Sequence, residues 1–270
     1  MIKPNFLNTA NNLYEEAFSA NACWLLLQQY RKNAQTYQDE MQCSPAFYSV
    51  IYHALIDSLF LSLSKLYDWH PNALTLRTLI EDIGTLDVSD LHPSALEKYS
   101  FCEPGFQHTL KPVEEPFFPK EVSEHRKILS LLSLDQHPLT IDLSLPQLIT
   151  LYKQRFQSLQ NQSVISNLIT LRNKILAHND KPTNFEYDSI WKDYPLSDDN
   201  IEALLEFALD FLLFCIGILT GVQKATECVN INDWQSTLEY VKIGRICRDD
   251  YLQKLYSDDI SQIRKQSPID

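Results

Sequence analysis

The sequence predicts an all-α protein, built as an antiparallel helical bundle around one core. Only 5 glycines occur in 270 residues, and long segments place apolar side chains at three- and four-residue steps, which is the period of a helix. No Asn-Gly pair and no clean alternation of apolar and polar residues indicates a hairpin. Because 44% of the residues are hydrophobic and 21% are charged, the composition is that of a folded globular protein.

The first helix is predicted within residues 8–40. We expect Asn8 or Thr9 to cap it, because short polar side chains accept hydrogen bonds from the free amides of a first turn. Its apolar stripe consists of Leu13, Ala17, Ala20, Trp24 and Leu27.

A second helix is predicted from Pro45, with Ser44 as its N-cap, since proline suits the first helical position. Its apolar face consists of Phe47, Ile51, Leu55, Leu59, Leu63 and Leu66. A shorter helix is expected at residues 75–84, where Gly84 favours a C-terminal stop.

Residues 85–118 lack the helical periodicity of the preceding segments. Four prolines and Gly105 fall in this range, and the segment fits neither a helix nor a strand. We therefore expect an irregular, proline-rich insertion or lid. A helix is predicted to resume at Pro119.

Three later helices are predicted, and the last of them spans residues 198–228. Their expected N-caps are Ser144, Ser163 and either Ser197 or Asp198. The bundle is expected to occupy residues 1–230, with the insertion at about 85–140. Residues 231–270 are expected to add one or two amphipathic helices as a C-terminal extension that packs on the bundle.

The most apolar stretch, residues 203–222, is interrupted by Glu206 and Asp210. The uninterrupted remainder is too short to cross a bilayer, so we expect a buried core helix and no membrane association. The first residues also lack the apolar region and cleavage site of a secretory signal. These features predict a cytoplasmic protein.

The formal net charge of −12 argues against a general nucleic-acid binder, because phosphate contacts need Lys and Arg. Residues 145–181 differ from the rest, since five basic residues and one acidic residue give this segment a charge of +4 and leave −16 elsewhere. A local basic patch suits a small anion or a short RNA segment. Its charged residues are Lys153, Arg155, Arg172, Lys174, Asp180 and Lys181.

Neither the six cysteines nor the seven histidines have the spacing of a zinc site. His53 and Asp57 lie four residues apart on one predicted helix and could share a metal, but this spacing is far more typical of a polar pair within a helix bundle. We expect no metal and no cofactor.

The stretch from Leu171 to Lys181, LRNKILAHNDK, combines a buried helix pattern with chemically active side chains. On a straight helix, Arg172 and His178 would point about 120° apart, with a rise of about 9 Å. Arg172 could fold toward the helix end, or the helix could break near His178. Two copies of the segment could also face each other across a two-fold axis, and this third arrangement explains best why a buried helix carries exposed chemistry.

A structural role for the same arginine is the alternative. Arg172 would then pair with Asp57 or Asp68 inside the bundle, and its position near a helix C-terminus would favour the helix dipole.

The segment RNKILAH resembles the Arg-x(4–6)-His signature of the HEPN superfamily, helical-bundle proteins of prokaryotic defence and toxin–antitoxin systems. The flanking LRNKILAHND and the upstream ALIDSLFLSLSKLYDWHPNALTLRTLIEDI are similar to its abortive-infection U-type (AbiU-like) branch. The resemblance covers residues 8–84 and 145–225. It implies a HEPN-type bundle, with the proline-rich insertion and the C-terminal helices outside it.

The resemblance implies a metal-independent endoribonuclease that acts as a homodimer on a short or single-stranded RNA segment. The implied catalytic residues are Arg172, Asn173 and His178. Imidazole can exchange protons with a ribose 2′-OH near neutral pH, and a guanidinium can stabilise the phosphorane. The implied nucleic-acid-binding residues are Lys174, Asn179, Lys181 and Arg155.

A cognate antitoxin is a possible further partner of such an enzyme. The alternative is a non-catalytic helical module that binds RNA, a nucleotide or a protein partner. A third reading is a plain scaffold whose long helices mediate self-association.

Overall fold

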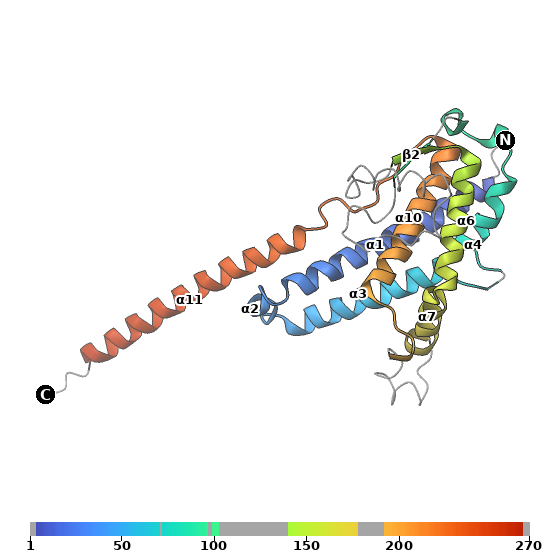
Figure 1. The fold of residues 1–270 in the computed structure, drawn as a ribbon. Coiled ribbons are helices and arrows are strands. Elements are labelled where there is room, and N and C mark those ends of the chain that lie inside the picture. Colours follow the sequence, from blue (N-terminus) through green and yellow to red (C-terminus); the bar gives the residue numbers. More distant parts are fainter. Residues whose placement is uncertain (1–3, 71, 97–98, 103–139, 178–191, 267–270) are drawn as a thin grey trace, which may run out of the picture. The chain divides into compact units, whose positions relative to one another are not determined.

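The computed structural model describes residues 4–70, 72–96, 99–102, 140–177 and 192–266 (Figure 1). Helices dominate these residues, which confirms the all-α class. The α-helices are α1 (Pro4–Asn33), α2 (Gln38–Met41), α3 (Pro45–Leu66), α4 (Leu76–Asp82), α6 (Leu145–Asn161), α7 (Val164–Leu171), α10 (Asp198–Thr220) and α11 (Asp233–Gln266). The remaining elements are the 3-10 helices η1 (Ile83–Thr85), η2 (Val88–Asp90) and η3 (Pro93–Leu96), the strands β1 (Tyr99–Cys102) and β2 (Thr140–Leu143), and the π-helix η5 (Arg172–Ala177).

The chain divides into two compact units, and the division falls within α1 and α3. The first unit comprises residues 1–21 and 57–227, and the second comprises residues 22–56 and 228–270. The predicted domain boundary at residue 230, and the packing of a C-terminal extension on the bundle, stay predictions.

The core of the first unit lies between α6 and α10, which run antiparallel side by side (Figure 1). The ring of Tyr152 stacks on that of Phe214, with centroids 4.8 Å apart, and also contacts Phe211 at 5.4 Å. Phe156 contacts Phe207 at 5.6 Å. Aromatic pairs of this kind add to the free energy gained by burying apolar surface, so they stabilise the packing of α6 on α10.

The apolar stripe predicted for the first helix is confirmed, because each of its five residues is buried. The helix starts at Pro4, however, and not after a cap at Asn8 or Thr9. Proline needs no hydrogen-bonded amide and favours the first turn, so the start moves one turn earlier than the polar residues suggested.

The helix predicted from Pro45 is confirmed over Pro45–Leu66, but its apolar face is only partly covered. Leu59, Leu63 and Leu66 are buried, whereas the side chain of Phe47 is 56% exposed and that of Ile51 is 36% exposed. Periodicity shows which residues share a face, but it does not show whether another element packs there.

The helix α10 ends eight residues before the predicted end at residue 228. It starts as predicted, because the amide of Asn200 donates to the hydroxyl of Ser197 at 3.2 Å. It stops at Thr220 because Gly221 adopts a left-handed conformation, with φ of 69°, and closes the helix through a hydrogen bond from its amide to the carbonyl of Gly217. A left-handed glycine after the last turn is a common helix stop.

Two short strands lie within and at the end of the predicted insertion at about 85–140. Strands β1 and β2 pair in antiparallel fashion, with Tyr99 opposite Leu143, a small pair that the sequence pattern did not reveal. Helix α6 follows at once, and Ser144 donates its amide and hydroxyl to the side-chain oxygen of Gln147, as expected for a capping residue. The helix predicted from Pro119 lies outside the described residues.

The second unit has a small core of its own, where α11 meets α2 and neighbouring parts of α1 and α3. Tyr37, Met41 and Leu238 are buried there, and Trp234 stacks on Tyr30 with ring centroids 6.1 Å apart. Arg245 of α11 forms ion pairs with Asp39 at 3.0 Å and Glu40 at 2.9 Å. The one or two helices predicted for the C-terminal extension form a single continuous helix, Asp233–Gln266.

By length and composition alone, α3 and α10 are the two described helices that could cross a membrane. Two thirds of the apolar window in α10 is buried, and twelve of its residues belong to the core. This burial confirms the interpretation of residues 203–222 as a core helix.

Candidate functional site

Arg172, the central residue of the candidate site, lies where the chain changes from an α-helix to a π-helix. Helix α7 begins after Ser163 and buries Val164, Ile165, Leu168 and Leu171. At Arg172 the hydrogen-bonding pattern widens, and residues Arg172–Ala177 form a π-helix. Such π-helical turns are rare and often occur at functional sites.

The guanidinium of Arg172 is held by two acceptors. Its Nη1 donates to Oδ2 of Asp68 at 3.0 Å, and its Nε donates to Oδ1 of Asn173 at 3.0 Å. The side chains of Arg172 and Asp68 are 22% and 27% exposed, so the ion pair is partly shielded from water. Of the two partners that the sequence offered for a structural pairing, Asp57 and Asp68, the structure selects Asp68.

The turn that carries Asp68 is itself fixed. The preceding residue, Tyr67, is buried, and its hydroxyl donates to the carbonyl of Leu204 at 2.6 Å. Burial raises the pKa of Tyr67 well above its ordinary value, although the charge of Arg155 opposes this. The phenol therefore keeps its proton and anchors the end of α3 to α10.

The carboxyl of Asp68 is stabilised in its charged form. Burial raises the pKa of Asp68. The lowering effects together outweigh it: they are the hydrogen bond and the positive charge of Arg172 and the hydrogen bonds from the amides of His70 and Trp69. The pKa of Asp68 therefore lies below its ordinary value. Asp68 is therefore ionised at neutral pH and can hold the guanidinium.

The guanidinium of Arg172 has more donors than its hydrogen bonds to described residues use. A guanidinium carries five N–H groups, and two of them are used by Asp68 and Asn173. Among the described residues, no hydrogen bond uses the others. An arginine that is held at one edge and open at another can bind a phosphate with little loss of side-chain entropy.

The two residues after this arginine are a predicted catalytic residue, Asn173, and a predicted nucleic-acid-binding residue, Lys174. Asn173 and Lys174 follow Arg172 and are exposed. The ammonium of Lys174 lies over the ring of Tyr194, 4.8 Å from its centroid. This cation–π contact orients the lysine without neutralising its charge.

Arg155, in contrast, lies inside the protein and not on an RNA-facing surface. Its side chain is 8% exposed and pairs with Asp210 at 3.3 Å. Its guanidinium also lies 5.5 Å from the ring centroid of Phe207 and 5.6 Å from that of Tyr152. The structure therefore corrects the expectation that Arg155 contacts nucleic acid, because this charge is already satisfied in the core.

Three predicted site residues, His178, Asn179 and Lys181, lie outside the described residues. The structure brings Arg172, Asn173 and Lys174 together on one segment. The relation of Arg172 to His178, and the sharing of the site between two copies, stay predictions.

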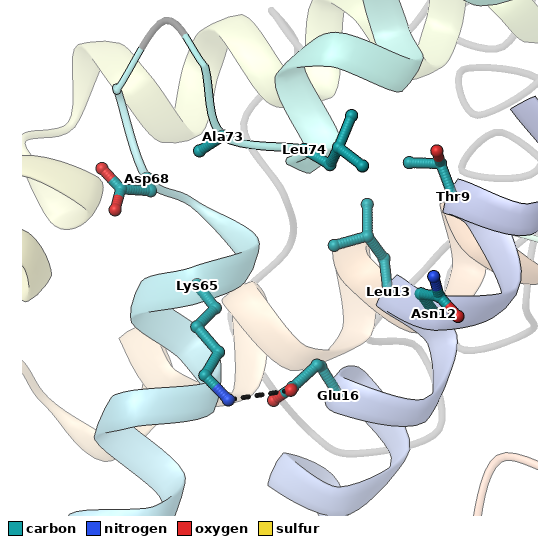
Figure 2. A pocket seen from close by; sticks show the side chains of 8 residues that line it. All are labelled: Thr9, Asn12, Leu13, Glu16, Lys65, Asp68, Ala73 and Leu74. Atoms are coloured by element: carbon teal, nitrogen blue, oxygen red, sulfur yellow. Dashed lines mark hydrogen bonds and ion pairs between the residues drawn. The ribbon is translucent and has the colours of Figure 1, made fainter. Parts of the chain in front are cut away.

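A cavity of about 330 Å³ opens beside Asp68 (Figure 2). Its lining residues come from α1, from the end of α3 and from the turn before α4, and they are Thr9, Asn12, Leu13, Glu16, Lys65, Asp68, Ala73 and Leu74. Glu16 receives hydrogen bonds from Lys65 at 2.8 Å and from Ser62 at 3.0 Å. Sequence reasoning missed this cavity, because its residues come from three separate segments.

A comparison with protein-family models decides the classification. The model described as AbiU2, of the HEPN type, matches residues 3–237.

The chain belongs to the AbiU2 family of HEPN proteins. The resemblance found in RNKILAH and its flanks is thereby confirmed, and the family match also takes in residues 85–144, which the resemblance had left out. No curated protein and no solved structure matches the chain. The AbiU2 name implies a link to abortive infection, and both partners of the Arg172–Asp68 pair lie within the matched residues.

Proposed function

We infer that this AbiU2-family protein is a cytoplasmic, metal-independent endoribonuclease of a prokaryotic defence or toxin–antitoxin system. It cleaves RNA by attack of the ribose 2′-OH on the adjacent phosphate. The observation that carries the proposal is the guanidinium of Arg172, which is fixed by Asp68 and Asn173 and has further donors that no other described residue uses. Membership in the AbiU2 family of HEPN proteins supports this reaction class.

In this mechanism, Arg172 binds the scissile phosphate and stabilises the extra negative charge that develops as the phosphorane forms. Preorganised donors of this kind are a large source of catalysis, because they need no reorganisation during the reaction. Asn173 positions the guanidinium, and Lys174 adds positive charge along the RNA backbone.

His178 is proposed as the proton-transfer group. It removes the proton of the 2′-OH or protonates the leaving 5′-oxygen, and a positioned group of this type contributes roughly 10²–10⁴-fold in rate. We propose that two copies form the site together, with Asn179 and Lys181 contacting the RNA and a cognate antitoxin able to block it.

The test is incubation of purified protein with total RNA in the presence of a chelator. The wild type is expected to cleave, and the His178→Ala variant is expected to lose cleavage while keeping its helical content. His53→Ala is the matched control, because His53 is an exposed histidine on α3. Equal cleavage by the wild type and His178→Ala would end the proposal.

The alternative, a non-catalytic module, makes a different prediction in the same assay. RNA would then stay intact, while binding of a labelled oligonucleotide would still weaken with added salt, because counterions are released on binding. The exposed Lys174 beside Arg172 favours this as the second candidate.

A further inference from the structure

A second cavity, of about 350 Å³, is lined by Trp69, the residue that follows Asp68. It is formed by Trp69 in that turn, by α4 and by α6, all within the first unit. Its lining residues are Trp69, Arg77, Ile80, Glu81, Lys153, Phe156, Gln157 and Gln160. Its volume lies in the range of about 300–1,000 Å³ that small-molecule sites occupy.

The apolar part of this cavity combines a rigid wall with an exposed ring. Phe156 is buried, and its ring stacks on that of Tyr67 with an interplanar angle of 9°. The large side chain of Trp69, in contrast, is 45% exposed. An exposed indole that lines a cavity offers a flat surface on which a planar group can stack.

The polar part comes mostly from one stripe of α6. Lys153, Gln157 and Gln160 follow each other at steps of four and three residues, so they share a face of the helix. An amide both donates and accepts hydrogen bonds, which is what the edge of a nucleobase requires. Across the cavity, Arg77 pairs with Glu81 at 2.8 Å, and both side chains are more than half exposed.

The chain connects this cavity directly to the anchored arginine. Tyr67, Asp68 and Trp69 are consecutive: the first hydrogen-bonds to Leu204, the second holds Arg172, and the third lines the cavity. A ligand stacked on Trp69 is therefore placed by the same turn that places Arg172.

We propose that this cavity binds a nucleobase of a single-stranded RNA, with Trp69 as the stacking surface, Gln157 and Gln160 as the base-edge contacts and Lys153 as a phosphate contact. The identity of the ligand rests on the proposed ribonuclease function. Aromatic stacking combined with amides and a lysine is the chemistry of single-strand RNA recognition. An apolar ligand would leave the two amides without partners at a cost in affinity.

The test separates the contribution of the bases from that of the backbone charge. A labelled 2′-O-methyl oligonucleotide, which lacks the attacking hydroxyl and cannot be cleaved, is compared with an abasic oligonucleotide of equal length. The full-length wild type is expected to bind the base-containing strand more tightly than the abasic one. Trp69→Ala is expected to abolish this preference and to weaken binding of the base-containing strand by roughly 5- to 150-fold, the range for loss of one stacked base.

One further variant tests a base-edge contact, and another serves as a control. Gln157→Ala is expected to weaken binding of the base-containing strand by roughly 2- to 10-fold, as for loss of one hydrogen bond. Gln154→Ala is the matched control and is expected to change affinity less than about twofold, because Gln154 is an exposed glutamine of α6 that does not line the cavity.

The proposal is overturned if the wild type binds both strands equally, or if Trp69→Ala and Gln157→Ala keep the wild-type preference for bases. Either result would leave cleavage by the wild type untouched, so the ribonuclease proposal would survive. If binding depends on Trp69 but the protein cleaves no RNA, the proposal of base binding in the cavity is supported and the ribonuclease proposal is rejected.

Discussion

Arg172 and Asp68 lie 104 residues apart in sequence, yet Nη1 of the arginine lies 3.0 Å from Oδ2 of the aspartate. The pair joins the first residue of the π-helix η5 to the turn that follows α3. The position of the guanidinium therefore depends on tertiary structure and not on the helix alone. We expect substitutions at Asp68 to act on both stability and RNA cleavage.

Replacing Asp68 by asparagine removes the charge but keeps the size of the side chain. We expect Asp68→Asn to lower the free energy of unfolding by about 1–2 kcal/mol, because a partly shielded hydrogen bond to a charged group is lost. Urea denaturation measures this change. Glu81→Gln removes the acidic partner of the exposed Arg77 pair and should cost less than about 0.5 kcal/mol; equal costs for the two variants would contradict the account.

The same pair predicts a pH dependence. The folded pKa of Asp68 lies below its ordinary value of 3.8, so its stabilising effect is complete well above that value and is lost as the pH falls toward the folded pKa. The difference in unfolding free energy between wild type and Asp68→Asn should therefore be constant from pH 7 to about pH 5. It should shrink below about pH 4, and a difference that grew on acidification would have the wrong sign.

Arg155 is expected to matter for stability and not for RNA binding. Arg155→Ala should lower the free energy of unfolding by about 2–3 kcal/mol, because it removes a packed stem and an ion pair, although the half-exposed Asp210 can regain water. Thermal unfolding measures this loss. Lys153→Ala, an exposed position on the same helix, should stay within about 0.5 kcal/mol of wild type. A stable Arg155→Ala protein with weakened RNA binding would restore the role that the sequence suggested.

A side chain at position 221 is expected to lower the stability of the protein. Its φ of 69° disfavours residues with a Cβ, and a Cβ built there would lie 2.6 Å from Cε1 of His92. Gly221→Ala should therefore destabilise the protein by more than about 1 kcal/mol, seen as a lower Tm. Gly244→Ala in α11 is the control, since nothing lies within 4 Å of its Cβ position; it should be neutral or stabilise by up to about 1 kcal/mol.

The elements set by local signals were predictable from the sequence. The buried stripe from Leu13 to Leu27 follows from helical periodicity, and the starts at Pro45 and Ser197 follow from the chemistry of helix caps. Gly221 carried a local signal for the end of α10, but the apolar run around it favoured a longer helix.

The candidate site was predictable only in part, because its geometry depends on contacts between distant segments. Charge and spacing singled out Arg172 and offered Asp68 as a partner, but could not decide between Asp68 and Asp57. The π-helix has no known local signature that periodicity would detect. Arg155 was misassigned because counting charges along α6 does not show which face meets α10.

The most direct test of the account is the chemistry of the RNA ends that the protein produces. A defined oligoribonucleotide is incubated with the purified protein and a chelator, and the fragments are weighed by mass spectrometry, beside the same strand carrying 2′-deoxyribose at the cleaved position. We predict a 2′,3′-cyclic phosphate on the upstream fragment and no cleavage at the deoxy position, because the attacking group is the 2′-OH. Cleavage of the deoxy strand, or a 3′-hydroxyl end, would contradict the proposed roles of Arg172 and His178.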